Sequence, residues 1–435
     1  MQNIQHLVLL VGTNPLPNYV VAKYFLTREN KLKKIWLVYS EKIGNQNSTR
    51  DLAENLSNVL NKITEVSIKF ISLSDVSSAK KIESDIKEKL IPKFFDEYVH
   101  LNYTGGTKAM SVHVYRTLER ELGNRCSFSY LDSRDYILKN DNGIITNDLR
   151  DEINISFDDL IDLHGCEKVE SEYKPKWIEV IDAFERLIVE DKLKDEYLKW
   201  VKEFLRKVYF KNNDFIREVD KFVEHNHLPG KSDYLNNFFR NNTKVDVMKL
   251  LQKIPSEYSI INEDGTLWLP NKKDKNIENT YKKRLGTSVE NFLNGKWLEV
   301  YVSEVLKRNL KKQNDKSIVL VDNWKIKKKT ARKPFEIDLL ALYGYQLCGI
   351  SITTSDREPT CKGKVFEILH RVHQLGGSES KAILITCLPK KNIYRFKKDL
   401  ETITGATKEK LLVLCEADLK PDDLWRKIYR HIKEE

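Results

Sequence analysis

The chain contains 435 residues, of which 40% are hydrophobic and 32% charged, a size that allows two or three globular domains. No apolar run approaches the roughly 20 residues that cross a bilayer, and no basic segment precedes the apolar stretch near the start, so we expect neither a membrane-spanning nor a secreted protein. The six cysteines lie far apart without a CxxC pair, which argues against a disulfide framework and a zinc site. A cytoplasmic location fits these features.

The positive charge of the chain is concentrated in one region. Lys and Arg number 74 against 64 Asp and Glu, a net charge of +10. Residues 271–333 contain 18 Lys or Arg and 7 Asp or Glu, so this segment carries the excess and the rest of the chain is nearly neutral. Such an excess favours a surface that faces a polyanion, although a basic solvated face is the alternative.

The first 165 residues alternate apolar strands with amphipathic helices. Strands are predicted at 6–11, 35–39, 66–71, 98–101 and 126–131, and helices at 19–27, 48–63, 79–94 and 108–122. This alternation predicts a Rossmann-like, doubly wound α/β sheet over residues 1–165, with ligands bound beyond the carboxyl ends of the strands.

The rest of the chain divides into a helical region and a second α/β unit. Residues 174–254 have apolar residues at helical spacing, and residues 255–285 suit a connector, so residues 166–286 are predicted as a helical linker region. In residues 287–435 we expect helices at 291–310 and 364–375, strands at 318–321, 335–342, 347–353, 382–386 and 411–415, and a basic helical segment between the last two strands.

A glycine-rich turn between a strand and a helix is the most informative segment, Asn102-Tyr103-Thr104-Gly105-Gly106-Thr107-Lys108. Glycines permit positive φ and the close approach of a ligand, and the free amides at the start of a helix favour an anion. The threonines add hydroxyl groups and Lys108 adds a charge. The turn is neither a Walker A loop nor a GxGxxG fingerprint. A tight turn with a threonine N-cap is the alternative explanation.

A second turn follows the first strand, Gly12-Thr13-Asn14-Pro15. In a doubly wound sheet, the turns on either side of the switch point share one crevice. We therefore expect this turn and the glycine-rich turn to lie together as one phosphate-binding site.

These segments, together with the later ISFDDLIDLHG, resemble the CARF domain, the cyclic-oligoadenylate sensor of type III CRISPR accessory proteins. The resemblance covers roughly the first 165 residues. It implies a homodimer whose two-fold axis passes through cyclic tetraadenylate or cyclic hexaadenylate. By position, the residues that contact this ligand are Gly12, Thr13, Asn14, Asn102, Thr104, Gly105, Gly106, Thr107 and Lys108.

Two carboxylates in the C-terminal unit lie on one predicted strand. Glu336 and Asp338 are two residues apart and therefore point to the same face, among apolar neighbours. A buried acid needs a partner, and a divalent metal is one; an exposed edge position is the alternative. Upstream, Glu299 lies on a predicted helix beside a tryptophan, where it is either a third acid of this site or an ordinary surface residue.

The segments FLNGKWLEVYVSEVL and FEIDLLALYGYQLCGISITTS resemble the PD-(D/E)xK nuclease domain of CARF effector nucleases, a restriction-endonuclease-like α/β fold. Asp338 matches the first acid of that family. In the following E-x-K triplet, Ser351 stands where the glutamate is expected and Thr353 replaces the lysine. The resemblance implies Mg²⁺ or Mn²⁺ held by Asp338, Glu336 and Glu299, with Lys364 or Lys362 supplying the lysine from the next helix.

The sequence therefore predicts a metal-dependent endonuclease, activated by cyclic oligoadenylate, that cleaves RNA or DNA. His370 and His373, three apart on one helix, are either proton shuttles or surface residues. Because the triplet departs from the family pattern, a ligand-gated nucleic-acid-binding or regulatory protein is the alternative. Slow degradation of the cyclic ligand by the sensor domain is a further possibility.

Overall fold

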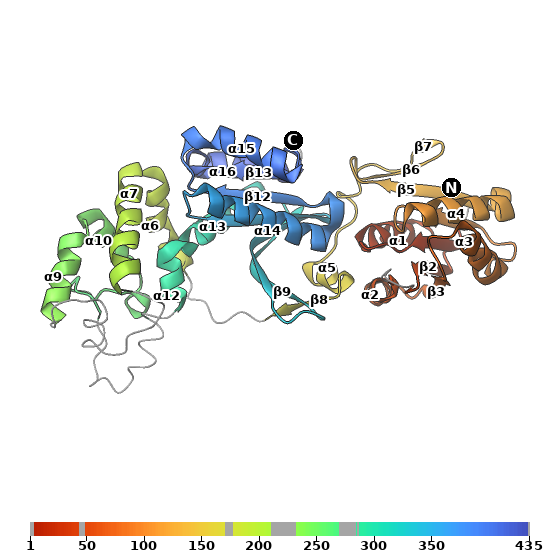
Figure 1. The fold of residues 1–435 in the computed structure, drawn as a ribbon, viewed down its shortest axis with the longest axis horizontal. Coiled ribbons are helices and arrows are strands. Elements are labelled where there is room, and N and C mark those ends of the chain that lie inside the picture. The colour runs from red at the N-terminus through yellow and green to blue at the C-terminus, as the bar shows by residue number, and fades with distance from the viewer. Residues whose placement is uncertain are drawn as a thin grey trace, which may run out of the picture.

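The computed structural model describes residues 4–42, 48–169, 177–209, 232–268, 284 and 287–433. Within these residues it contains a seven-stranded N-terminal sheet and a six-stranded C-terminal sheet. The C-terminal sheet lies between the N-terminal sheet and a group of helices from the middle of the chain (Figure 1). The mixed α/β class predicted from the sequence is confirmed.

The N-terminal sheet has the strand order β3-β2-β1-β4-β5-β6-β7. Its strands are β1 (His6–Leu10), β2 (Lys34–Ser40), β3 (Ser67–Leu73), β4 (Val99–Asn102), β5 (Cys126–Asp132), β6 (Ile137–Asn140) and β7 (Gly143–Ile144). The first five strands in this list are parallel, and β6 and β7 add an antiparallel extension. The strand order reverses between β1 and β4, which makes the gap beyond their carboxyl ends the switch point of the sheet.

Helices cover both faces of this sheet. They are α1 (Leu16–Arg28) and α2 (Arg50–Leu60) on one face, and α3 (Ala79–Asp85), which continues as a π-helical turn (Ile86–Leu90), and α4 (Lys108–Leu122) on the other. β1 is buried at every position because apolar side chains of the two helical layers pack on its two faces.

The C-terminal sheet has the order β13-β12-β11-β10-β9-β8. Its strands are β8 (Cys166–Val169), β9 (Ile318–Lys328), β10 (Phe335–Tyr343), β11 (Gln346–Thr353), β12 (Lys381–Thr386) and β13 (Leu411–Leu414). Strands β8 to β11 pair antiparallel, and β11, β12 and β13 are parallel. One face carries α14 (Glu358–Gly376) and α15 (Lys390–Thr404), and the other carries α13 (Trp297–Gln313) and α16 (Pro421–Lys433).

Three parts of this architecture differ from the sequence prediction. Residues 166–169, expected in the helical linker region, form β8 at the edge of the C-terminal sheet. β9 extends to Lys328, well beyond the predicted 318–321, because its basic second half pairs with β8 and β10. Strands β6 and β7 and helix α16 were not predicted.

The middle region is helical, as predicted. It contains α6 (Ile178–Val189), α7 (Asp191–Trp200), a π-helical turn η4 (Val201–Tyr209), α9 (Ser232–Asn242) and α10 (Val245–Leu251). After the connector, α12 (Thr287–Asn291) and the turn η7 (Phe292–Lys296) lead into α13. Trp177 stacks on Phe292 with ring centroids 4.1 Å apart, so the helical region shares a core with the beginning of the C-terminal unit.

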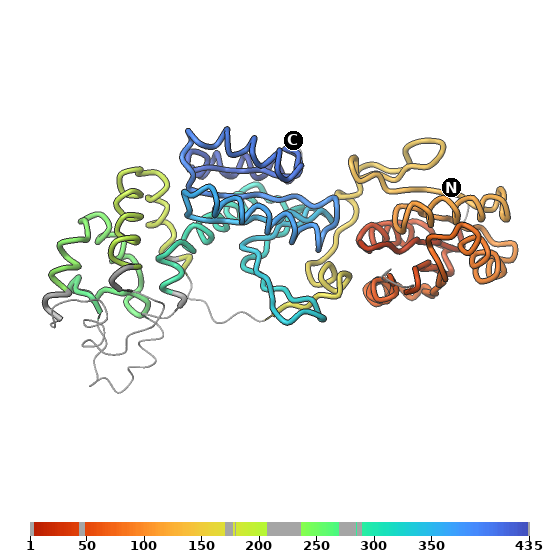
Figure 2. Tube along the Cα trace, in the orientation of Figure 1, coloured from red at the N-terminus to blue at the C-terminus, as the bar shows by residue number. Residues whose placement is uncertain are grey.

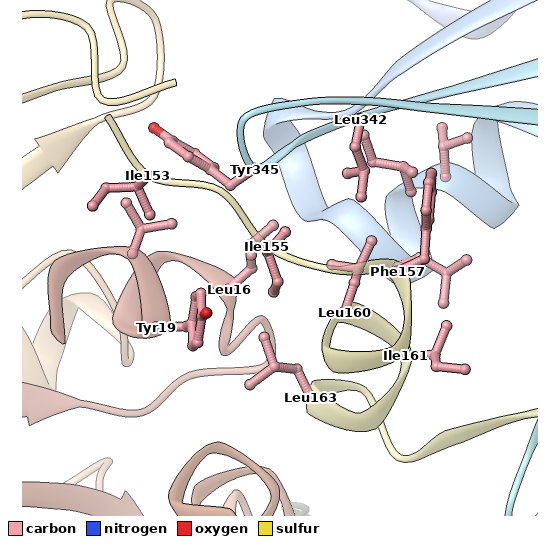
Figure 3. Packing of buried hydrophobic residues seen from close by; sticks show 14 of the residues in the cluster. Leu16, Tyr19, Ile153, Ile155, Phe157, Leu160, Ile161, Leu163, Leu342 and Tyr345 are labelled. Atoms are coloured by element: carbon pink, nitrogen blue, oxygen red, sulfur yellow. The ribbon is translucent and has the colours of Figure 1, made fainter. Parts of the chain in front are cut away.

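One continuous hydrophobic core joins the N-terminal and C-terminal units. Leu16 and Tyr19 of α1 contribute to the same cluster as Leu342 of β10 and Tyr345 of the turn after it, with α5 (Phe157–Leu163) between them (Figure 3). The tube in Figure 2 follows the chain from the first sheet through α5 into β8. The two units are therefore packed as neighbours rather than tethered by a free linker.

Polar contacts fix the same junction. The buried Gln346 side chain accepts a hydrogen bond from Arg150 Nη1 at 2.8 Å and donates to the Tyr136 hydroxyl and to the Glu379 carbonyl, at 2.5 and 3.0 Å. Arg150 lies over the Tyr136 ring, 3.7 Å from its centroid.

In the part of the chain that the structure describes, none of the helices has the length and the apolar character needed to span a membrane.

Candidate functional site

The loops after β1 and β4 touch at the switch point of the N-terminal sheet. A Cβ atom on Gly12 would lie 2.8 Å from the Gly106 amide nitrogen, and one on Gly105 would lie 2.0 Å from the Leu10 carbonyl oxygen. Gly106 has a φ of +77°, in the left-handed region. Glycine is thus required because the two backbones pass in direct contact, and the two turns lie together at the switch point, as the sequence predicted.

A buried hydrogen-bond chain supports the loop after β4. His100 and Asn102, both on β4, each bond the Ser129 hydroxyl of β5, at 2.7 and 3.0 Å. Asn102 Oδ1 then accepts from the Thr104 amide at 3.2 Å, and Thr104 Oγ1 accepts from the Leu131 amide at 2.7 Å. Asn102 is fully buried, so in this structure its side chain positions the loop and is not exposed to solvent.

His100 stays neutral inside this chain, because burial lowers its pKa from 6.5 to about 3. Since the unfolded chain takes up a proton near 6.5 and the folded one does not, folding stability is expected to fall as the pH drops from about 6.5 to 3, by at most about 1.4 kcal/mol per pH unit for this residue. Urea unfolding of His100→Gln between pH 7 and 4 should therefore show a shallower loss than wild type. The exposed His373→Gln is the control, and equal slopes for all three proteins would contradict the prediction.

The open side of the loops presents donors and a positive charge. Thr13, Thr107 and Lys108 are exposed. Thr107 is the N-cap of α4, where its Oγ1 accepts from the Met110 amide at 3.2 Å. The start of this 15-residue helix therefore places its positive dipole end and the exposed Lys108 directly after the glycine-rich loop. This surface can bind a phosphate group.

Asn14 faces the C-terminal unit instead. Its Oδ1 accepts from the Leu16 amide at 3.1 Å and lies 3.2 Å from His164 Nε2, at the end of α5. A Cβ atom on Gly377, just after α14, would lie 1.7 Å from Asn14 Nδ2 and 3.2 Å from Glu379 Oε2. Glu379 Oε2 is buried and has no hydrogen-bond partner among the described residues. Asn14 therefore connects the loop after β1 to the C-terminal end of α14.

Asp338 lies at the centre of the C-terminal site. Its Oδ2 accepts from the Ile352 amide at 2.7 Å and from the Ser351 hydroxyl at 3.3 Å, because β10 and β11 pair antiparallel and place these residues opposite it. Burial raises the pKa of Asp338, and the hydrogen bond from Ile352 and the positive charges of Lys364 and Lys296 offset only part of that effect. A carboxylate with a raised pKa beside two lysines is typical of functional sites.

Lys296 joins the two glutamates that the sequence placed in this site. Its Nζ lies 3.2 Å from Glu336 Oε1 and 3.8 Å from Glu299 Oε2. Burial would lower the pKa of Lys296, but the attraction of these carboxylates and of Asp338 outweighs it and raises the pKa. The Asn323 amide lies in the same group; with its nitrogen turned to the acids, it donates to Glu299 at 3.0 Å and to Glu336 at 3.3 Å.

The predicted three-carboxylate metal site is not assembled in this arrangement. Within the residues that the structure describes, no group of three or more His, Cys, Asp or Glu side chains could hold a metal ion. Lys296 lies between Glu299 and Glu336, where a shared ion would compete with its charge. The carboxylate chemistry suits Mg²⁺ or Mn²⁺, and Mg²⁺ commonly takes only one or two protein carboxylates beside water and substrate phosphate. Asp338 alone fits such a role.

The other predicted residues differ in how they relate to this centre. The positive charge of Lys364 favours the ionised form of Asp338, whereas Lys362 pairs with Asp399 at 3.2 Å. Thr353 lines a cleft beside Asp338. His370 and His373 are exposed on α14.

Sequence reasoning missed Lys296 and Asn323. The signal for Lys296 was its position three residues before Glu299 at the start of a helix, which brings the two side chains to one face. Asn323 carried no such signal, because its place depends on the long β9 and on its left-handed φ of 49°.

Comparisons with known proteins agree with these two units. The family model of the Card1 CARF domain matches residues 6–156. The solved structure of Can2 from Sulfobacillus thermosulfidooxidans, in complex with cyclic tetra-adenylate, has a TM-score of 0.62 at 16% identity and covers 98% of this chain and 99% of its own.

Protein VC1899 from Vibrio cholerae has a TM-score of 0.62 at 16% identity and covers 98% of both chains. A search of curated proteins found no match. The chain is therefore similar to the Card1 CARF domain over residues 6–156 and shares the fold of Can2 and VC1899 along nearly its whole length.

Proposed function

We propose that this protein is a nuclease of type III CRISPR defence that is activated by cyclic oligoadenylate. The observation that carries the proposal is the pair of touching glycine loops at the β1/β4 switch point, with Lys108 and the start of α4 beside them. The match to the Card1 CARF domain supports the same ligand class, and the Can2 structure contains cyclic tetra-adenylate. Cyclic tetraadenylate is the first candidate and cyclic hexaadenylate the second.

The proposed active form is a homodimer. A cyclic ligand repeats the same phosphate group around a ring, and two copies of the loop pair related by a two-fold axis would offer it the same donors twice. In each copy Thr13, Thr107 and Lys108 provide the exposed groups, whereas Asn102 and Thr104 hold the loop in place.

The proposed hydrolytic centre is Asp338 with Lys296 and Lys364. The two lysines offset the negative charge that develops on a phosphodiester under attack, and Lys296 takes the place of the lysine missing from the triplet. Mg²⁺ or Mn²⁺, held by Asp338, would supply an activated water. The Ser351 hydroxyl and the Ile352 amide orient the Asp338 carboxylate.

The proposed coupling between the two sites passes through Asn14 and α14. The C-terminal end of this helix meets Asn14 at Gly377, and its N-terminal part carries Lys364 toward Asp338. Because the units share one hydrophobic core, a shift of the loop after β1 is transmitted to a packed helix. Ligand binding would then favour one arrangement of the dimer over another.

Gly377→Ala should weaken this coupling, because the new methyl group would overlap Asn14. We expect cleavage stimulated by cyclic tetraadenylate to fall at least about tenfold, while calorimetry shows the ligand still bound, as for the removal of a coupling energy of about 1–3 kcal/mol. Gly405→Ala is the matched control: Gly405 has a similar φ of +66° but no atom within 4 Å of the added Cβ. Equal stimulation in the two variants would contradict the coupling route.

The test of the function is cleavage of labelled RNA, single-stranded DNA and duplex DNA with Mg²⁺ or Mn²⁺, with and without each cyclic oligoadenylate. We expect cleavage only with ligand and metal, and its loss in EDTA. Cleavage that is independent of every ligand would overturn the gating.

The second candidate is a ligand-gated nucleic-acid-binding or regulatory protein. It is favoured by Ser351 and Thr353 in place of glutamate and lysine, and by the absence of a three-carboxylate group from the described residues. Ligand-dependent binding of nucleic acid without cleavage under any metal would support it.

A further inference from the structure

A cleft of about 650 Å³ separates the helical region from the C-terminal sheet. One wall comes from the end of α7 and from η4, and includes Lys202 and Arg206. The other wall comes from residues 353–360, which are the end of β11, the loop after it and the start of α14; it begins two residues after Ser351, a hydrogen-bond partner of Asp338. The cleft therefore opens beside the proposed hydrolytic centre, on a part of the chain that the sequence treated only as a linker.

Its charged side chains are mostly basic. Lys202, Arg206 and Arg357 line it against a single carboxylate, Asp356. All three cations are exposed, and within the described residues neither Lys202 nor Arg357 forms an ion pair. Arg206 is oriented by Asn294, whose Oδ1 and carbonyl oxygen accept from its guanidinium at 2.8 and 3.2 Å. The cleft thus presents positive charge with few internal partners.

The opposite wall is rigid and rich in hydroxyl groups. Ser355 is fixed on two sides, since its amide donates to Thr353 Oγ1 at 3.2 Å and its carbonyl accepts from the Thr386 hydroxyl at 2.7 Å. Thr354 packs on Gly295, where an added Cβ would lie 2.8 Å from Thr354 Oγ1. Hydroxyl groups on a fixed segment are suited to phosphate oxygens.

Residues 294–296 join the cleft to the acidic centre. Asn294 bonds Arg206, Gly295 packs on Thr354, and Lys296 lies between Glu299 and Glu336. The turn that orients Arg206 therefore also places Lys296 beside Asp338. A nucleic-acid strand bound to Arg206 would lie next to this turn.

Resting on the proposed nuclease function, we propose that this cleft binds the sugar-phosphate backbone of one nucleic-acid strand and that Lys202, Arg206 and Arg357 contact its phosphates. A volume in the range of a small-molecule pocket takes about two nucleotides and no duplex. None of the described lining residues is aromatic, so base stacking is not provided and binding should be insensitive to sequence. The helical region is thus part of the substrate site.

The test is fluorescence anisotropy with fluorescein-labelled, mixed-sequence single-stranded RNA and DNA, carried out with the full-length protein in the presence of EDTA and cyclic tetraadenylate over a range of NaCl concentrations. In Lys202→Gln and Arg357→Gln we expect weaker binding, and the slope of log affinity against log salt should fall by about 0.7 for each phosphate that the variant no longer neutralises. Arg206→Gln should behave likewise. Lys199→Gln, an exposed lysine on α7 outside the cleft, is the matched control and should bind as wild type.

The outcomes separate this inference from the nuclease proposal. Reduced affinity and slope in the cleft variants, together with no cleavage by wild type under any metal, would support the cleft and refute the nuclease. Unchanged slopes in all three cleft variants, or no binding of either oligonucleotide by wild type, would overturn the cleft. Melting temperatures within the error of wild type exclude unfolding as the cause of weaker binding.

Discussion

Gly105→Ala is expected to abolish detectable binding of cyclic tetraadenylate in isothermal titration calorimetry. The added methyl group would lie 2.0 Å from the Leu10 carbonyl oxygen and 3.1 Å from Asn18 Oδ1, so the loop after β4 must move away from the loop after β1. Because the nearest neighbour is a backbone carbonyl, the shift displaces the start of α4 and Lys108 away from the loop after β1. Cleavage stimulated by the ligand should disappear together with binding.

Two further variants keep this prediction open to contradiction. Gly363→Ala, where no atom lies within 4 Å of the new Cβ, is the glycine control and should bind the ligand as wild type. Lys108→Met removes only an exposed charge and should weaken binding about tenfold or more, as expected when a hydrogen bond to a charged group is removed, without lowering the melting temperature. Wild-type affinity in both Gly105→Ala and Lys108→Met would refute the site.

Much of the N-terminal unit could be predicted from the sequence. Strand-like segments of four to six residues alternate there with segments of helical spacing, and the strand-to-helix turns after the first and fourth of them are marked by glycine and threonine. The side-chain roles could not be predicted as well. The family resemblance implied that Asn102 and Thr104 contact the ligand, but Asn102 is buried and Thr104 Oγ1 bonds Leu131, because β5 brings Ser129 and Leu131 alongside β4.

The C-terminal site also could be predicted only in part, because the partners of its side chains come from other elements of the chain. Spacing along one strand indicates that Glu336 and Asp338 share a face, but it carries no information on which partner arrives from another element. Lys296 comes from a turn 40 residues before Glu336. Its positive charge pairs with the carboxylates for which the sequence predicted a metal ion. The cleft was missed because Lys202 and Arg206 belong to the helical region. The apolar periodicity there predicts which residues form the core of that region, but not which exposed residues face another part of the chain.

The contact between the two units could not be predicted by any local pattern. The end of the helix predicted at 364–375 is nearly correct, since α14 ends at Gly376 and Gly377 follows it with a φ of +71°. The contact of Gly377 with Asn14, more than three hundred residues away, depends on the packing of α14 against α5.

Asp338→Asn should lower ligand-stimulated cleavage at least about a hundredfold while binding of cyclic tetraadenylate stays unchanged. The asparagine Oδ1 can still accept from the Ile352 amide, so the change removes the charge and keeps the shape. The expected result is loss of product in a gel assay at saturating ligand and metal. Asp322→Asn is the control, because this acid on β9 bonds Ser303 and Lys307, outside the cluster of Asp338.

A second measurement on Asp338→Asn separates loss of chemistry from loss of structure. Burial raises the pKa of Asp338, so the folded state holds its proton to a higher pH than the unfolded state, and wild-type stability falls as the pH rises through that raised value. The neutral asparagine carries no such penalty. The variant should therefore melt above wild type at pH 8, and the difference should shrink toward acidic pH, where Asp338 is protonated. Removing an unfavourable buried charge from a functional site is expected to raise stability while it abolishes activity. A variant that is inactive and also less stable than wild type at pH 8 would therefore mean that Asp338 is a structural residue.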